Sequence, residues 1–458
     1  MENKNFSPTV QDTKTGNGKK ILFATVPFDG HVNPLTGLAV HLKQLGYDVR
    51  WYTSEYYTAK MKKLQIPHYT FVNAMDVRSS DDIEEVFPER KKYTGQVAKL
   101  NFDIVNVFIQ RATEYYADVK EIYKTFPFDL MIADFSFTAI PFVTEKMKIP
   151  VITGGIVPLM ETSKSLPPSG LGMTPSYSVA GKIKQAALRF FADKILFRKA
   201  TAALKQMCEE NQLSYHGENV FDYLFKRSTL VLQSGTPGFE YYRGDLSSNI
   251  RFAGALMPHV FETNQQPWFD DRLNKYERVI LLTQGTVERD VEKLLVPTLE
   301  AFKNTDVLVV VTTGRSGTAA LKERYPFDNI IIEDFIPFGD IMPYTDVYVT
   351  NGGYGGVLLG IEHGLPLVVA GVHEGKNEIA ARTGYFQLGI NLKTETPQVN
   401  QVRRAVNEVF ANPVYKENVR QLSAEFLQYD AKELGAKYVA ALLQKGHAVQ
   451  KQPYTIQY

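Results

Sequence analysis

Cysteine is nearly missing from this chain, because Cys208 is the only one among 458 residues. One cysteine cannot form an intrachain disulfide, so a disulfide-stapled scaffold is excluded and a reducing cytoplasm is the expected compartment. Long hydrophobic runs are missing as well: no window holds about 18 uncharged apolar residues. We therefore expect a cytoplasmic protein without a membrane span.

An excess of one charge is also missing, because 51 Lys and Arg stand against 50 Asp and Glu. A net charge of +1 gives no strong field toward nucleic acid or an acidic membrane surface. Residues 1–19 are polar and do not resemble a signal peptide, so we expect a flexible tail. The abundant aromatics, 25 Tyr and 28 Phe, indicate either core packing or a flat apolar ligand pocket.

The first half of the chain begins with a strand–helix–strand pattern. Residues 19–27 and 47–53 are apolar, strand-like runs, and leucines at helical spacing lie between them. Asn33 is a good helix cap and Pro34 a good first helical residue, which predicts that this helix begins there. Strands joined by a helix pair in parallel, so a parallel sheet is expected.

A second series of strands and helices follows a proline-bearing stretch, 255–275, that we interpret as a linker. The pattern predicts an α/β protein of two doubly wound, Rossmann-like parallel-sheet domains that face each other across a cleft. The expected divisions are a tail, a first domain, the linker, a second domain and a C-terminal helix that crosses back to the first domain: 1–19, 20–254, 255–275, 276–424 and 425–458.

The most informative stretch is residues 346–373, where the apolar strand DVYVT enters the glycine-dense turn NGGYGG and a short helix. Gly352, Gly353, Gly355 and Gly356 leave backbone N–H groups uncovered at the positive end of the helix dipole. Phosphate groups bind at such helix starts. The stretch predicts a diphosphate site in the second domain.

Two polar residues in the first half follow or end predicted strands. His31 lies just after the first strand, and no His or Cys stands near it at metal-ligand spacing, so a general base is one interpretation and a structural histidine the other. Asp134 ends the run FDLMIADF and can orient that base from the same sheet edge, or it can cap the following segment.

These features together resemble the UDP-glycosyltransferase-like family one of GT-B glycosyltransferases, including bacterial enzymes that move rhamnose or glucose onto flavonoids and other polyphenols. The resemblance rests on GHVNP (30–34), Asp134, FIPF (335–338) and the stretch 350–382, in this order and spacing. It implies that His31 deprotonates an acceptor hydroxyl, that Asp134 orients His31, and that the sugar is transferred with inversion and without a metal. The first domain would bind the acceptor and the second the nucleotide sugar.

The resemblance also implies two sets of binding residues. The residues matched to the donor are Thr283, Gly285, Thr286, Thr313, Gly314, Phe335, Ile336, Asn351, Gly352, Gly353, Gly355, Gly356, Glu374 and Lys376. The acceptor-side residues are Phe28, Phe87, Met160 and Leu171, and the acceptor expected is a small hydrophobic hydroxylated compound such as a flavonoid. The only cofactor-like molecule is the co-substrate, a dTDP- or UDP-sugar.

The chain departs from the family pattern at three places, and these bear on the donor. Asn351 stands where the family usually has His, and Asn carries no positive charge. Leu359 stands where uridine-specific members often place a Glu on the ribose hydroxyls, although Glu362 lies one turn on. An apolar residue there suits a 2′-deoxyribose, which favours a dTDP-sugar. Residues Glu374–Lys376 do not preserve the pair of residues that contacts the sugar in the family, which allows a 6-deoxy sugar. The favoured donor is therefore dTDP-rhamnose, with dTDP- or UDP-glucose as alternatives.

Three other functions fit the sequence less well. A nucleotide-sugar epimerase or hydrolase of GT-B fold would need acidic catalytic residues instead of a His–Asp pair. A dinucleotide oxidoreductase would need the spaced glycines of a Rossmann turn, which PFDGHVNP lacks. A non-catalytic binding module would not need His31 and Asp134.

Overall fold

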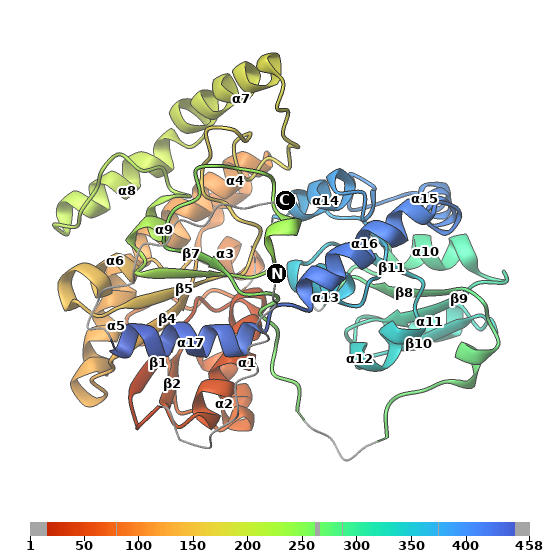
Figure 1. Cartoon of the computed structure of the whole chain (residues 1–458), viewed down its shortest axis with the longest axis horizontal. Coiled ribbons are helices and arrows are strands. Elements are labelled where there is room, and N and C mark those ends of the chain that lie inside the picture. Colours follow the sequence, from red (N-terminus) through yellow and green to blue (C-terminus); the bar gives the residue numbers. More distant parts are fainter. Residues whose placement is uncertain (1–15, 79, 262–265, 286, 374, 445–458) are drawn as a thin grey trace, which may run out of the picture.

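Two parallel sheets organise this computed structural model, which describes residues 16–78, 80–261, 266–285, 287–373 and 375–444 (Figure 1). The first sheet has the order β3-β2-β1-β4-β5-β6-β7 and the second β10-β9-β8-β11-β12-β13. All pairings between these strands are parallel. The strands are β1 (Lys20–Ala24), β2 (Asp48–Tyr52), β3 (His68–Tyr69), β4 (Leu130–Asp134), β5 (Val151–Gly155), β6 (Leu230–Gln233), β7 (Ile250–Phe252), β8 (Val279–Thr283), β9 (Leu308–Thr312), β10 (Ile330–Glu333), β11 (Val347–Thr350), β12 (Leu367–Val369) and β13 (Gly389–Asn391).

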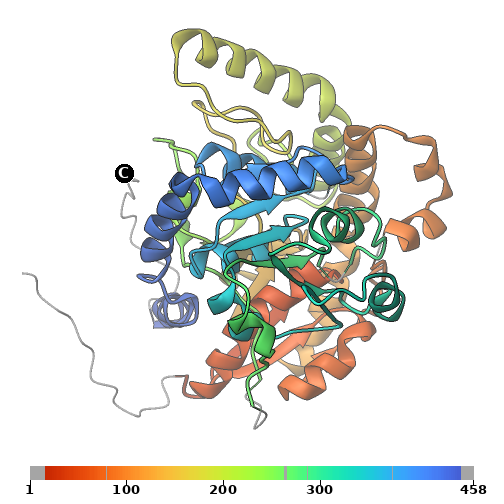
Figure 2. The same ribbon diagram turned by 90° about the vertical axis from the view of Figure 1, so that its right-hand side faces the viewer.

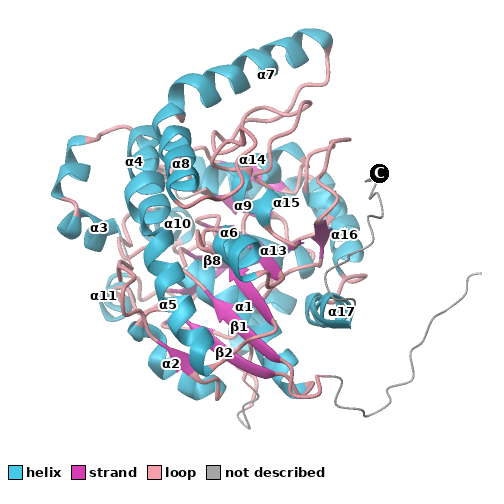
Figure 3. Cartoon of the chain, turned by 90° about the vertical axis from the view of Figure 1, so that its left-hand side faces the viewer, coloured by secondary structure: helices cyan, strands magenta, loops and turns pink. Residues whose placement is uncertain are grey.

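Helices surround both sheets, and Figure 3 shows them as an outer layer around the strands of the first sheet. We call the part built on the seven-stranded sheet the first lobe and the part built on the six-stranded sheet the second lobe. The α-helices are α1 (Asp29–Gln44), α2 (Thr58–Leu64), α3 (Ser80–Val86), α4 (Gln96–Asp103), α5 (Ala112–Thr125), α6 (Ile140–Phe142), α7 (Val179–Phe191), α8 (Arg198–Glu210), α9 (Tyr223–Arg227), α10 (Leu295–Phe302), α11 (Thr318–Arg324), α12 (Phe338–Ile341), α13 (Tyr354–Glu362), α14 (Lys376–Tyr385), α15 (Val399–Ala411), α16 (Pro413–Phe426) and α17 (Ala431–Gln444). Short 3₁₀ or π turns connect several of them.

The central strands are continuous apolar runs because both faces of each sheet are covered. In β1, Ile21 and Phe23 belong to one buried cluster while Leu22 and Ala24 belong to another. Successive strand residues point to opposite faces, so each face packs against its own helices. The predicted fold class, two parallel-sheet α/β domains, is confirmed.

Helix α1 begins earlier than the sequence predicts. The expected cap at Asn33 and start at Pro34 are wrong, because the helix starts at Asp29 and holds Pro34 as its sixth residue. A proline this close to the start removes only the hydrogen bond to the carbonyl of Gly30, which limits its cost. His31 therefore lies in the first turn of a helix and not in a free loop.

The C-terminal part of the described chain folds as three helices, α15, α16 and α17. Asn412 separates α15 from α16 and caps α16, since its side chain accepts a hydrogen bond from the N–H of Val414. Helix α17 then packs on α1 of the first lobe, as Figure 1 shows in dark blue. A Cβ on Gly435 would lie 2.6 Å from a methyl carbon of Leu38, so the two helices approach closely there.

The described parts of the predicted linker, 255–261 and 266–275, contact both lobes. The N–H of His259 donates to Thr36 Oγ1 of α1 at 2.9 Å, and the N–H of Trp268 donates to Asp340 in the second lobe at 2.9 Å. At the N-terminus, the N–H of Gly16 bonds the carbonyl of Leu45 at 3.0 Å, so residues 16–18 form a turn on α1. Within the described ranges, no helix has both the length and the apolar character needed to cross a bilayer.

Candidate active site

His31 and Asp134 lie side by side at the carboxyl edge of the first sheet. Asp134 is the last residue of β4, which pairs directly with β1, and α1 follows β1. His31 Nδ1 lies 2.8 Å from Asp134 Oδ1, and the carboxylate is completely buried. Since a carboxylate only accepts, Nδ1 donates, which leaves Nε2 as a proton acceptor.

The Asp134 carboxylate is fixed by backbone donors as well. Its Oδ2 accepts from the N–H of Val26 and its Oδ1 from the N–H of Ser136, both at 2.8 Å. The contact to Ser136 makes a local turn, while the helix cap considered as the alternative is not seen, because the next helix begins at Ile140. Three donors hold this buried carboxylate in one orientation.

Aromatic rings hold the imidazole from two sides. The ring of Phe135 stacks on His31 with 5.4 Å between centroids, and Phe28 lies at 5.7 Å in a tilted orientation. Phe28 also contacts Phe108, which packs against the small cluster that includes Phe87. Of the predicted acceptor residues, Phe28 therefore contacts His31 directly, whereas Phe87 is linked to Phe108 only through the aliphatic cluster of Val77, Ile83 and Val107.

The glycine-dense turn forms the start of α13, as expected. Gly352 has φ +81° and a Cβ there would lie 2.7 Å from Val369, so the turn requires glycine. Gly353 is the N-cap residue, and a Cβ on Gly355 would meet nothing within 4 Å. The N–H groups of the first turn of α13 have no partner within the helix, and the space beside Gly355 is open, so an anion can approach the helix start from that side.

Side chains with positive charge stand near this helix start. A pocket at the carboxyl edge of the second sheet is lined by Gln284, Glu288, Lys293, Leu294, Asn351, Ala370, Lys376 and Glu395. A hydrogen bond to Glu288 raises the pKa of Lys293, so its ammonium group stays charged. The Asn351 amide donates to the carbonyl of Gln284, which fixes its orientation. The lining thus holds two cations beside two carboxylates, and Lys293 is already paired with Glu288, so the pocket carries no net charge until a ligand rearranges these pairs.

Four predicted donor residues use their groups within the protein. Thr283 Oγ1 donates to the carbonyl of Thr312 and accepts from the N–H of Gly285. Thr313 Oγ1 bonds Thr318 Oγ1, and the N–H of Gly314 bonds the carbonyl of Asp334. These residues shape the loops after β8 and β9.

The predicted base-stacking residues have unequal exposure. Phe335 is 53% exposed, with the guanidinium of Arg315 lying 5.2 Å above its ring. Ile336 is buried in the core of the second lobe, so only its backbone can reach a ligand. Gly356 lies in the first turn of α13, beside Tyr348. Thr286 and Glu374, two further predicted donor residues, lie outside the described residues.

The two lobes contact each other at the edges that carry these groups. Tyr354, in the glycine-dense turn, donates its hydroxyl to the carbonyl of Ser234, just after β6, at 2.7 Å. A Cβ on Gly235 would lie 3.0 Å from that hydroxyl. The start of α13 is thus placed against the carboxyl edge of the first sheet, the edge that also carries His31.

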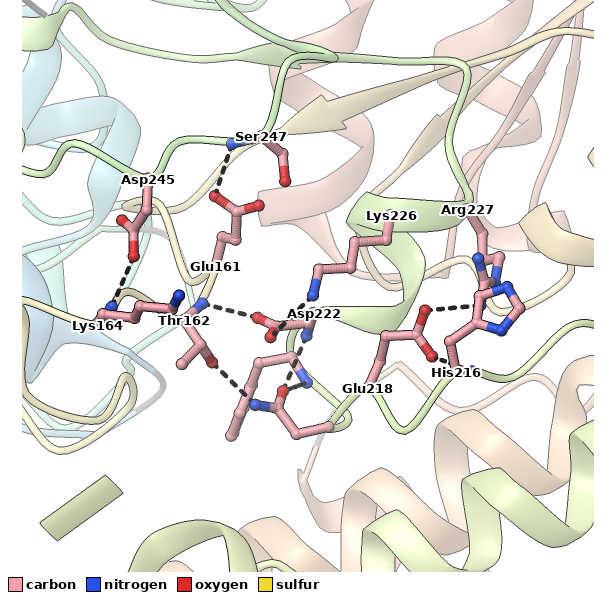
Figure 4. A network of polar contacts seen from close by, with 12 residues as sticks. Glu161, Thr162, Lys164, His216, Glu218, Asp222, Lys226, Arg227, Asp245 and Ser247 are labelled. Atoms are coloured by element: carbon pink, nitrogen blue, oxygen red, sulfur yellow. Dashed lines mark hydrogen bonds and ion pairs between the residues drawn. The ribbon is translucent and has the colours of Figure 1, made fainter. Parts of the chain in front are cut away.

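Loop 156–178 of the first lobe, which carries the predicted acceptor residues Met160 and Leu171, is anchored by carboxylates. Figure 4 shows its first part, where Asp222 accepts from the N–H of Thr162 and Asp245 from that of Lys164, both at 2.7 Å. Met160 packs beside Leu159 in a small apolar cluster. The loop is therefore held firmly to its own lobe at this end.

The loop is also connected to the second lobe through a buried arginine. Arg382 of α14 donates to Glu240 at 2.7 Å and to Glu378 at 2.9 Å, and it is 3% exposed. Each carboxylate uses its other oxygen on the loop: Glu240 accepts from the N–H of Leu159 at 2.7 Å and Glu378 from that of Gly172 at 2.8 Å. Burial alone would lower the pKa of Arg382, but the two carboxylates raise it above its ordinary value.

Known proteins resemble the chain over nearly its whole length. Residues 297–439 match the family described as erythromycin biosynthesis protein CIII-like, C-terminal domain. The chain is 32% identical over 414 residues to 4′-demethylrebeccamycin synthase of Lentzea aerocolonigenes, which covers 90% of this chain and 97% of that protein. This protein belongs to the UDP-glycosyltransferase-like GT-B glycosyltransferases.

Other members of this glycosyltransferase family agree with that assignment. UDP-glucosyltransferase 1 of Beauveria bassiana is 27% identical over 462 residues, 93% of this chain and 95% of its own. The crystal structure of the calicheamicin glycosyltransferase CalG4 aligns with a TM-score of 0.70 at 20% identity, over 93% of this chain and 98% of its own. The Streptomyces sp. SF2575 glycosyltransferase SsfS6, complexed with thymidine diphosphate, aligns with a TM-score of 0.61 at 18% identity, over 92% and 99%. The protein is thus a nucleotide-sugar glycosyltransferase.

Several residues of this glycosyltransferase's site were not found from its sequence. Phe135 directly follows Asp134 in the sequence, and this adjacency could have indicated that its ring lies near His31. Lys293 lies in no motif and carried no signal. The contact of Arg382 with Glu240 joins residues 142 positions apart on different lobes, which no local pattern can indicate. Among the described residues, no group of three His, Cys, Asp or Glu side chains could hold a metal ion.

Replacing Arg382 by Ala should destabilise this glycosyltransferase by about 3–5 kcal/mol, because Glu240 and Glu378 would stay buried without their counter-charge. Urea unfolding followed by circular dichroism measures the change. Arg324→Ala is the control: Arg324 pairs with Glu292 on the exposed surface of α11, so its loss should change stability little. Equal midpoints for the two variants would show that the buried cluster does not stabilise the lobe contact.

Proposed function

We propose that this protein is an inverting, metal-independent O-glycosyltransferase that moves a sugar from a nucleotide diphosphate to a hydroxyl of a small hydrophobic acceptor. In this proposal the first lobe binds the acceptor and the second lobe the donor, with 255–275 as the linker between them. The observation that carries it is the hydrogen bond between His31 Nδ1 and the buried Asp134, which leaves Nε2 able to take a proton. This pair favours transfer over epimerisation or hydrolysis, for which acidic catalytic residues were expected.

His31 acts as the general base in the proposed reaction. Its Nε2 takes the proton of the acceptor hydroxyl as the oxygen attacks the sugar C1. The bond from C1 to the diphosphate oxygen breaks, and the leaving diphosphate keeps the electron pair. Attack opposite the leaving group inverts the configuration at C1. Asp134 balances the imidazolium charge that develops.

The second lobe stabilises the leaving diphosphate. The uncovered N–H groups at the start of α13 and the ammonium groups of Lys293 and Lys376 supply positive charge for it. Phe335 offers a half-exposed ring on which a nucleobase can stack. No step in this scheme assigns a role to a metal.

The nucleotide we favour is a dTDP-sugar, because Leu359 would face a ribose. Leu359 is partly buried against the core of the second lobe and offers no partner to a 2′-hydroxyl. Glu362 is the alternative candidate for the residue that contacts the ribose. It is the last residue of α13, about 12 Å along the helix axis from the first residue of that helix. Burial raises the pKa of the Glu362 carboxyl, and Ser423 of α16 bonds the Glu362 carbonyl. The thymidine diphosphate bound to the related SsfS6 agrees with this choice.

The acceptor we favour is a flat aromatic compound such as a flavonoid or another polyphenol. The rings of Phe28 and Phe135 beside His31, with Phe108 next to Phe28, suit a planar apolar molecule. A rhamnosyl group is the preferred sugar, because Glu374–Lys376 do not preserve the pair of residues that contacts the sugar in the family.

A donor comparison tests this function. The enzyme is incubated in EDTA with one polyphenol and, in turn, dTDP-rhamnose, dTDP-glucose, UDP-rhamnose and UDP-glucose, and the products are identified by mass and by the NMR coupling at the anomeric carbon. We expect an O-glycoside of inverted configuration, formed fastest from a dTDP donor. Retained configuration, or a new nucleotide sugar made without acceptor, would contradict the proposal. A faster UDP donor would contradict only the choice of base.

A further inference from the structure

Helix α7 stands away from the body of the first lobe (Figures 1 and 2). Several of its large apolar side chains are exposed. Val179, Ile183 and Phe190 are 77%, 67% and 65% exposed. A π-helical turn, Ala192–Leu196, extends the helix and adds the exposed Ile195. Side chains of this kind rarely gather on a surface unless they meet a partner.

The exposed apolar residues form one stripe along the helix. At 3.6 residues per turn, Val179, Ile183 and Phe190 fall within about 40° of one another around the axis. The opposite side of the helix makes the contacts with the protein. Gln185, on that side, is buried and donates to the carbonyl of Ser165 at 2.9 Å. The stripe is therefore directed away from the lobe.

Basic residues flank this stripe. Residues 179–199 hold six Lys and Arg side chains and one Asp, although the whole chain has a net charge of only +1. Lys182 and Lys184 are exposed and lie on either side of the apolar stripe. From the low net charge of the chain we expected no field toward an acidic membrane. The surface of α7 is nevertheless locally basic. An apolar stripe between lysines is typical of helices that lie in the interface of anionic membranes.

The charge also argues against a second copy of the chain as the partner. A twofold contact through α7 would bring the same basic surface against itself, and like charges held together repel. An anionic bilayer meets both properties of the surface, since its lipid phosphates attract the lysines and its acyl chains take up the apolar stripe. Helix α7 is about 20 Å long, enough to lie on a bilayer but not to cross it.

We propose that α7 binds the surface of an anionic lipid bilayer, with Val179, Ile183 and Phe190 inserted at the headgroup boundary and Lys182 and Lys184 against lipid phosphates. The helix directly follows loop 156–178, which carries Leu171, so binding would hold that loop near the lipid. A hydrophobic acceptor dissolved in the membrane could then reach the first lobe without crossing water. The binding itself does not depend on the proposed function.

Vesicle sedimentation tests the proposal. Wild-type protein is mixed with vesicles of phosphatidylcholine and phosphatidylglycerol in equal parts, or of phosphatidylcholine alone. We expect binding to the anionic vesicles that is lost at high salt, and little binding to the neutral ones. The double variant Ile183→Glu, Phe190→Glu should lose binding, and Lys182→Gln with Lys184→Gln should weaken it about 30-fold. The control is Val260→Glu with Leu427→Glu, two exposed apolar residues outside α7, which should bind as the wild type does.

Three results would overturn the proposal. Equal wild-type binding to neutral and anionic vesicles would exclude a role for the basic residues, and this outcome needs no variant. Undiminished binding of the double glutamate variant, folded by circular dichroism, would exclude the apolar stripe. A wild-type dimer that the same variant converts to a monomer, by size exclusion with light scattering, together with no vesicle binding, would assign the stripe to self-association. Glycosyl transfer is not measured in any of these assays, so failure here leaves the proposed function untouched.

Discussion

Replacing His31 by Ala should lower turnover with an alcohol acceptor by about 10²–10⁴-fold, the usual contribution of a general base. Nε2 is the ring nitrogen left to accept a proton, because Nδ1 is held by Asp134 at 2.8 Å. Affinity for dTDP should stay close to that of the wild type, since every proposed donor residue belongs to the second lobe. Steady-state kinetics and calorimetric titration with dTDP measure the two effects separately.

A second acceptor sharpens this test. A phenol that is already ionised at the assay pH has no proton for His31 to remove, so His31→Ala should slow its glycosylation far less than that of an alcohol. The matched control is His68→Ala, in the same lobe, whose ring is held by the carbonyl of Thr53 at 3.1 Å. That variant should keep wild-type turnover. A folded His31→Ala enzyme with full turnover on the alcohol would show that the base assignment is wrong.

The alternation of strands and helices was predictable because each strand has both faces buried. Such strands are short apolar runs of five or so residues, as in β1 and β8, and they stand out against the amphipathic helices. The start of α1 was not predictable from local preferences. Pro34 is common as a first helical residue, but tertiary packing continues this helix five residues further toward the N-terminus.

For the site as well, only part of the contacts between residues could be predicted from the sequence. His31 and Asp134 could be paired from the sequence because parallel neighbouring strands end at one edge, which fixes where their following residues lie. Arg382 and Glu240 meet only because two lobes are docked, and no rule of spacing connects them. The division of roles between the lobes remains a prediction, as do the donor and acceptor residues.

The outer side of α7 shows a further limit of sequence reasoning. An amphipathic pattern predicts that the apolar side of a helix packs inward. In α7 the inward contacts are polar, since Arg189 donates to the carbonyl of Lys164 at 2.7 Å and Gln185 bonds Ser165, while the apolar stripe faces outward. Periodicity gives the direction of a stripe around the helix axis but does not say which side meets the protein.

Replacing Asp134 by Asn should lower turnover by a factor on the order of 10²–10⁴, although the side chain keeps its shape. The buried carboxylate accepts from Val26, Ser136 and His31, and Asn can accept with one of its two terminal atoms only. If the NH₂ group of the new Asn faces His31, it donates to Nδ1. Nδ1 must then be the acceptor, and the imidazole proton moves to Nε2. The imidazole then has the tautomer that cannot take a proton from the acceptor. Kinetics with the alcohol acceptor measure the loss.

Asp118 provides the control for this substitution, because it is also a buried carboxylate of the first lobe with backbone donors. It accepts from the Tyr52 hydroxyl at 2.7 Å and from the N–H of Val72 at 2.9 Å, with no contact to His31. Asp118→Asn should cost about 1–3 kcal/mol of stability through a mismatched buried donor, and turnover of the folded enzyme should stay near the wild-type value. Asp134→Asn should show a similar loss of stability together with the loss of turnover. If both variants lost turnover equally, the effect of Asp134 would be structural, and the imidazole would not depend on its carboxylate for the correct tautomer.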